Sequence, residues 1–122
     1  MKLTILGCSG SVPTADNPAS GYVVSFDNAP SIILDMGSGT LGQLAKLQDP
    51  CDAHVAFSHL HADHCADFPS LMVWRRFHPI TPAASRNFCF GPSATPTHLG
   101  RLSSDEVDGI DDMSDTLAFS PW

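Results

Sequence analysis

The sequence predicts a mixed α/β (α+β) fold in which strands come first and strands then alternate with helices. Two patterns indicate this order. Short apolar stretches rich in Val, Ile and Phe lie between clusters of Gly, Pro, Asn and Asp, as strands do. Between them, Leu41, Leu44 and Leu47 recur every three residues, a spacing typical of a helix. With 122 residues and 43% hydrophobic residues, the chain is expected to form a single domain over residues 1–122.

The strands and helices follow from local patterns. Residues 2–6 alternate in polarity, residues 7–13 form a turn-rich loop, and the turn at residues 27–30 joins two strands into a hairpin. In the longest helix, Leu71, Trp74 and Phe77 are expected to share one side. The expected strands are residues 2–6, 21–26, 31–35, 53–57 and 88–90 with a last one within 116–119, and the expected helices are residues 40–47, 67–77 and 95–103.

Charge and hydropathy exclude several classes of protein. The net charge is −7, and six acidic residues fall within residues 105–115, a run typical of a solvated loop. An acidic chain is a poor general nucleic-acid binder, although metal ions would supply local positive charge for a bound nucleotide. No apolar run approaches the roughly 20 residues of a membrane-spanning helix, and no secretory signal is visible. We therefore expect a cytoplasmic protein with reduced cysteines and no membrane contact.

Four metal-ligand side chains lie within six residues directly after the strand expected at residues 53–57. They are His59, His61, Asp63 and His64. In extended backbone, His59 and His61 project to the same side. Imidazole beside carboxylate suits zinc, iron or manganese. The mixture suggests two ions, one held by the first two histidines and one by the Asp-His pair, with a metal-activated water as nucleophile. A chance surface cluster of histidines is the alternative.

At these residues the sequence resembles the metallo-β-lactamase superfamily, whose signature H-x-H-x-D-H is matched fully by SHLHADH at residues 58–64. LDMGSG at residues 34–39 is similar to the strand and glycine turn that precede the site in that superfamily. Further stretches resemble the ribonuclease Z and phosphodiesterase branch, including bacterial cyclic-AMP phosphodiesterases. These stretches are LGCSGSVP at 6–13, NPASGY at 17–22, VWRRFHP at 73–79, FGPS at 90–93 and IDDMSD at 110–115.

The resemblance implies a four-layer αββα sandwich, of which this chain corresponds to the N-terminal half. It implies that His59 and His61 bind the first metal, that Asp63 and His64 bind the second, and that Asp63 also orients the attacking water. Asp35 is implied to brace the metal loop without binding metal, with capping of the glycine turn as the alternative. The ligands of the family's second half have no counterpart here. The remaining candidates, His54, His78 and His98, lack their sequence context.

The resemblance implies a dinuclear-metal-dependent hydrolase that cleaves phosphodiester bonds, such as those of cyclic AMP, by attack of a metal-bound hydroxide. One alternative is a ribonuclease Z-like endonuclease that trims the 3′ end of precursor tRNA. Another is an inert fragment that binds metal weakly. Two divalent ions are expected, zinc first with manganese or iron as alternatives, at partial occupancy. Arg75 and Arg76 are candidate phosphate contacts, with a solvated helix face or pairing with the acidic run as the alternative. Half of a sandwich would leave an apolar sheet face that favours self-association, for example as a homodimer.

Overall fold

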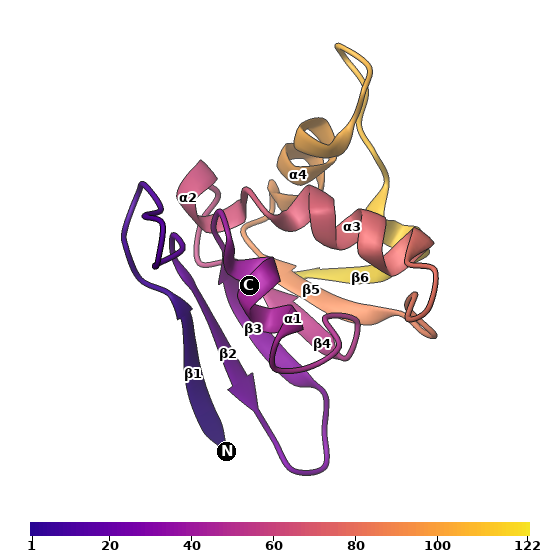
Figure 1. Ribbon diagram of the computed structural model, residues 1–122. Helices are drawn as coiled ribbons and strands as arrows, with labels where there is room; N and C mark the ends of the chain where they lie inside the picture. Colours follow the sequence, from indigo (N-terminus) through magenta and orange to yellow (C-terminus); the bar gives the residue numbers. More distant parts are fainter.

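The computed structural model describes residues 1–122 and contains one six-stranded sheet in the order β1-β2-β3-β4-β5-β6 (Figure 1). The first three strands form an antiparallel meander, and the last three each run parallel to the strand before. The strands are β1 (Lys2–Gly7), β2 (Gly21–Ser25), β3 (Ser31–Met36), β4 (Ala53–Ala56), β5 (Asn87–Gly91) and β6 (Leu117–Pro121).

All helices pack on one face of this sheet (Figure 1). Each connection between parallel strands moves one place in the same direction across the sheet. Because such crossovers are almost always right-handed, three successive ones in one direction place their helices on the same side. The helices are α1 (Thr40–Ala45), α2 (Ala62–Cys65), α3 (Phe68–Phe77) and α4 (Thr95–Ser103), followed by the 3₁₀ turn η1 (Met113–Asp115).

The core lies between the sheet and these helices. One residue in two along the strands points into it, such as Val23, Ile33 and Val55, which are almost fully buried. The helices contribute Leu44 and Leu71, also buried. A cluster of 17 buried hydrophobic residues results. It includes residues of all six strands, so one core holds the whole sheet to its helices.

The opposite face of the sheet carries no helix. Leu3 and Ile5 of β1 are 61% and 60% exposed, and Phe88 of β5 is 50% exposed. Leu3 pairs with Val24 across the strands, so both side chains lie on this same face, which continues over the central strands. We name the residues Leu3, Ile5, Tyr22, Val24, Ile32, Leu34, Phe88 and Phe90 the open sheet face.

The structure confirms every expected strand and helix, with ends that differ by one or two residues. The short helix α2 and the turn η1 were not predicted. Of the three residues expected on one side of the longest helix, Leu71 is buried, Trp74 is only partly buried and Phe77 is 72% exposed. The buried side of α3 is instead Phe68, Leu71, Met72 and Arg75. No helix has the length and apolar character that crossing a membrane requires.

We expect the isolated chain to self-associate through the open sheet face, because burying apolar area contributes roughly 25 cal/mol per Å². Exchanging Ile5 and Phe88 for Thr should lower the sedimentation-derived mass at a given concentration, whereas Val12→Thr, at an exposed loop residue, should not. A wild-type chain that stays monomeric and melts cooperatively would contradict this expectation.

Candidate metal centre

The four predicted metal ligands lie beyond the carboxyl ends of β3 and β4, two adjacent parallel strands. Asp35 lies near the end of β3, and the histidine loop begins immediately after β4. In open α/β sheets, binding sites occur at this edge because the strands deliver several loops to the same place. The local sequence supports the geometry, since Gly37 and Gly39 end β3 and let the chain turn into α1.

The carboxylate of Asp35 is the anchor of the histidine loop. Its Oδ1 accepts a hydrogen bond from the backbone N–H of Ser58 at 2.8 Å, and its Oδ2 accepts one from the Ser58 hydroxyl at 2.6 Å. The same Oδ2 lies 2.8 Å from Nδ1 of His64. Asp35 is 6% exposed and has a backbone φ of 61°, a left-handed conformation uncommon for a residue other than glycine. Strain of this kind persists where surrounding contacts fix it, as these three do.

These hydrogen bonds select the tautomers of two histidines. An ionised carboxylate only accepts, so Nδ1 of His64 donates to Asp35, and in the neutral ring this leaves the lone pair on Nε2. The Ser58 hydroxyl donates its single hydrogen to Asp35, so it accepts from Nδ1 of His59, 3.0 Å away. His59 therefore also presents an unprotonated Nε2, the form that binds a metal ion.

The ligand side chains are close together but do not form a closed site. The ring centre of His59 lies 4.8 Å from that of His61 and 4.0 Å from that of His64. Nε2 of His64 lies 3.2 Å from Oδ2 of Asp63, a spacing at which both atoms can face one ion. No group of three or more His, Cys, Asp or Glu side chains converges on one point. The donor atoms and the tautomers therefore fit divalent ions. The side chains that converge supply at most two ligands for one ion.

Backbone contacts hold the loop in place on the helix side. A Cβ atom at Gly37 would overlap the carbonyl oxygen of Asp63, so only glycine permits this close approach. The backbone N–H of Asp67 donates to the Met36 carbonyl oxygen at 3.0 Å. Oδ2 of Asp67 accepts a hydrogen bond of 2.9 Å from the N–H of Leu41, in the first turn of α1. The buried thiol of Cys65 donates to the His61 carbonyl oxygen, and burial raises its pKa.

Arg75 is part of the protein interior rather than of a substrate site. Its side chain is 2% exposed, and burial lowers its pKa. The guanidinium donates hydrogen bonds to the hydroxyl oxygen and the carbonyl oxygen of Thr116 and to Oδ1 of Asn87. It also donates to the carbonyl oxygens of Cys51 and Ser85. The guanidinium thereby joins α3 to the segments that lead into β4, β5 and β6.

Arg76 pairs with the acidic run, which was the alternative to phosphate binding. Nη1 lies 2.7 Å from Oδ2 of Asp111, and Nε lies 2.9 Å from Oδ2 of Asp115. Hydrogen bonds to both carboxylates raise the pKa of Arg76 above its usual value. Its charge is therefore already compensated.

The other three histidines lie away from the centre and have structural contacts or none. Nδ1 of His54 accepts from the N–H of Phe88 at 3.1 Å, which links β4 to β5. His78 stacks on Trp74 and accepts from the N–H of Thr81. His98 is exposed on α4. The roles of Ser58 and Asp67 were not predicted from the sequence. Ser58 carried a local signal, because it directly precedes the histidine motif, and Gly37 belongs to the glycine turn at residues 34–39.

Two kinds of known protein resemble the whole chain or most of it. It is 47% identical over 122 residues to uncharacterized proteins of Mycobacterium bovis and Mycobacterium tuberculosis, and it covers 44% of their length. It is 30% identical over 106 residues to a ribonuclease Z of Chlamydia trachomatis, which is 82% of this chain and 32% of that protein. No family model matches the chain.

Solved structures decide the fold. The metallo-β-lactamase fold protein YhfI from Bacillus subtilis superposes with a TM-score of 0.76 at 20% identity, over 98% of this chain and 46% of that one. The chain has the metallo-β-lactamase fold. The short form of human tRNase Z matches with a TM-score of 0.71 at 21% identity, and the match covers 99% of this chain and 44% of that protein. Zn²⁺-bound PqqB from Methylobacterium extorquens matches with a TM-score of 0.63 at 14% identity, and the match covers 100% of this chain and 46% of that protein. The chain thus spans less than half the length of these metallo-β-lactamase fold proteins.

We expect Asp35→Ala to destabilise the chain by about 3 kcal/mol, because it leaves the Ser58 N–H and His64 Nδ1–H without their buried acceptor. Urea unfolding followed by circular dichroism measures this. Asp27→Ala, at an exposed turn residue with no side-chain partner, is the matched control and should change stability by less than about 0.5 kcal/mol. Equal effects of the two substitutions would refute the anchoring role.

The two arginines should respond differently to substitution by Met, which keeps most of the chain length. Arg75→Met should cost about 3 kcal/mol, since five hydrogen bonds to the guanidinium are lost and the acceptors on Thr116 and Asn87 stay buried. Arg76→Met should cost about 1 kcal/mol or less, as partly exposed ion pairs do. A larger loss at Arg76 than at Arg75 in the same urea titration would reverse this assignment.

Proposed function

We propose that the histidine loop is the metal site of a hydrolase that cleaves phosphodiester bonds. His59 and His61 would hold one divalent ion, and Asp63 with His64 would hold a second. Zinc is the favoured ion, in keeping with the Zn²⁺-bound PqqB that shares the fold. Manganese and iron remain alternatives that accept the same ligands.

The observation that carries this proposal is the network centred on Asp35. A chance surface cluster of histidines would have no reason to share a buried carboxylate. Here Asp35 contacts His64 directly and His59 through Ser58, and both rings are left with an unprotonated Nε2 on the side away from the network. Orientation of metal-binding histidines by a hydrogen-bonded carboxylate is the usual arrangement in zinc sites.

The chain's own residues have distinct parts in the proposed reaction. Bound ions would supply a water of lowered pKa as nucleophile and would neutralise charge on the phosphate. Asp63, whose carboxylate lies beside His64, would accept a hydrogen bond from the attacking water and orient it. Asp35 and Ser58 would hold the rings in place without touching the substrate. Because both arginines are engaged in protein contacts, we assign phosphate binding to neither of them.

A cyclic nucleotide such as cyclic AMP is the proposed substrate. The net charge of −7 and the lack of a free arginine near the loop disfavour a long polyanion such as RNA. The second candidate is processing of the tRNA 3′ end, and it is favoured by the 30% identity to a ribonuclease Z. The two differ in the size and charge of the substrate, not in the chemistry at the metal.

The proposed site has only two protein ligands for each ion in this chain. Complete dinuclear binding would need further donors, either from a polypeptide as long as its relatives or from a second copy. The third possibility is a chain that binds metal weakly and catalyses nothing. Metal affinity and hydrolysis must therefore be measured separately.

We expect the metal-free chain to bind Zn²⁺ in isothermal titration, and His59→Ala with His61→Ala to weaken binding at least tenfold. His98→Ala, at an exposed histidine outside the loop, should bind as the wild type does. Hydrolysis of bis-p-nitrophenyl phosphate and of cyclic AMP should depend on added metal and disappear in Asp63→Asn. If His98→Ala weakens zinc binding as much as the loop variant, the site assignment is wrong. Zinc binding at the loop without any hydrolysis would instead select the inert alternative.

A further inference from the structure

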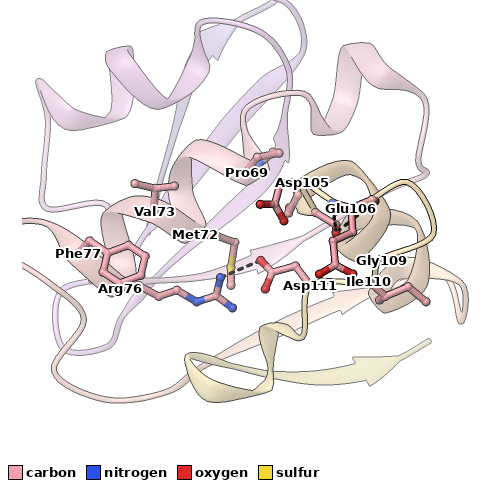
Figure 2. Close-up of a pocket in the computed structure, with 12 residues that line it drawn as sticks. Pro69, Met72, Val73, Arg76, Phe77, Asp105, Glu106, Gly109, Ile110 and Asp111 are labelled. Atoms are coloured by element: carbon pink, nitrogen blue, oxygen red, sulfur yellow. Dashed lines mark hydrogen bonds and ion pairs between the residues drawn. The ribbon is translucent and has the colours of Figure 1, made fainter.

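A groove of about 650 Å³ lies on the helix side of the molecule, between α3 and the segment 103–111 that follows α4 (Figure 2). None of the proposed metal ligands lines it. Pro69, Met72 and Val73 of α3 form one wall, and Ile110 lies across from them. The groove is on the face of the sheet opposite to the open sheet face, so covering that face would leave the groove accessible.

The groove exposes large apolar side chains. Val73 and Phe77 lie one turn apart on the outer side of α3, and both are mostly exposed. Ile110 is 51% exposed on the opposite wall. Figure 2 shows Val73 and Phe77 side by side at one end of the groove, with Ile110 at the other end. Neighbouring exposed apolar residues are more informative than single ones, because contiguous apolar patches mark interaction sites. Val73 and Phe77 provide a contact for an apolar side chain of a partner.

The rim of the groove is acidic, and two of its carboxylates have no basic side chain of this chain paired with them. Asp105 and Glu106 line it and form no ion pair. Arg76 is the only basic residue in the lining, and it is already bound to Asp111 and Asp115. The lining therefore contains three carboxylates and one guanidinium, a formal charge of −2. A cation next to an apolar group complements such a surface.

The rim is held in shape before any partner binds. The hydroxyl of Ser104 accepts from the N–H of Glu106, and the N–H of Gly109 donates to the Glu106 carbonyl oxygen. The N–H of Asp111 donates to the Gly100 carbonyl oxygen on α4. The first two bonds lie within the segment, whereas Asp111 is tied to α4 through Gly100 and to α3 through Arg76. A preformed surface costs less to bind because less of it must be ordered.

We propose that this groove binds a basic segment of a partner protein, one that carries Lys or Arg next to a large apolar side chain. The apolar side chain would lie against Val73 and Phe77, and the basic group would face Asp105 and Glu106 farther along the groove. The proposal is independent of the metal site, since it uses none of the metal-ligand residues.

The test uses the full chain and a short fluorescent peptide of alternating Lys and Leu residues, with binding followed by anisotropy. Asp105→Asn with Glu106→Gln should weaken binding about tenfold, as the loss of two ion pairs would. Asp16→Asn with Asp27→Asn removes the same charge at exposed residues elsewhere and should have less than about a twofold effect. Val73→Ser should weaken binding, and Val12→Ser, at an exposed loop residue, should not.

Two peptide controls and a mapping step complete the test. Replacing Lys by Glu in the peptide should abolish binding, and replacing Leu by Ser should weaken it. Amide chemical shifts of the wild-type chain should move at Val73, Phe77, Gly109 and Ile110. Absence of binding, an equal effect of the two charge-removing pairs, or shifts confined to the open sheet face would each overturn the proposal. Binding of an RNA oligonucleotide in competition with the peptide would also overturn it.

Discussion

The carboxylate of Asp35 connects the fold to the candidate site. It lies at the end of β3, where the backbone is forced into a left-handed conformation, and it accepts hydrogen bonds from Ser58 and His64 of the following loop. This is possible only because β3 and β4 are adjacent and parallel, so that the end of one strand faces the start of the loop after the other. Without that carboxylate, the loop would lose its main contact with the sheet, and the histidines would be free to adopt either tautomer.

The second constraint is the direction of the crossovers. Because each right-handed connection steps the same way, all helices gather on one face, and the sheet is left with two unlike sides. The helix side holds the core and the acidic groove beside α3. The open sheet face presents Leu3, Ile5 and Phe88 to solvent. The candidate metal centre lies at the strand ends between these sides, and contacts with the first turn of α1 help to hold its loop on the helix side.

Local sequence patterns were enough to predict the strands and the three longer helices, because each depends on residues a few positions apart. The Leu spacing of α1 is such a pattern. The motif at residues 58–64 is also local, and its metal ligands stay a prediction. The buried side of α3 could not be predicted in this way. Arg75 reads as a surface residue until the acceptors at Asn87, Thr116 and Ser85 are brought to it by the parallel strands. Likewise, the need for Gly37 arises only when the loop at Asp63 is folded over it.

The tautomers of His59 and His64 test the central role of Asp35 most directly. Long-range proton–nitrogen correlation spectra of the metal-free chain at neutral pH distinguish a protonated Nδ1 from a protonated Nε2. The Asp35 network predicts that both rings carry the proton on Nδ1, and that Asp35→Asn changes this pattern while His98 keeps its own. Protonation of both rings on Nε2 in the wild-type chain, or a pattern unaffected by the substitution, would contradict it.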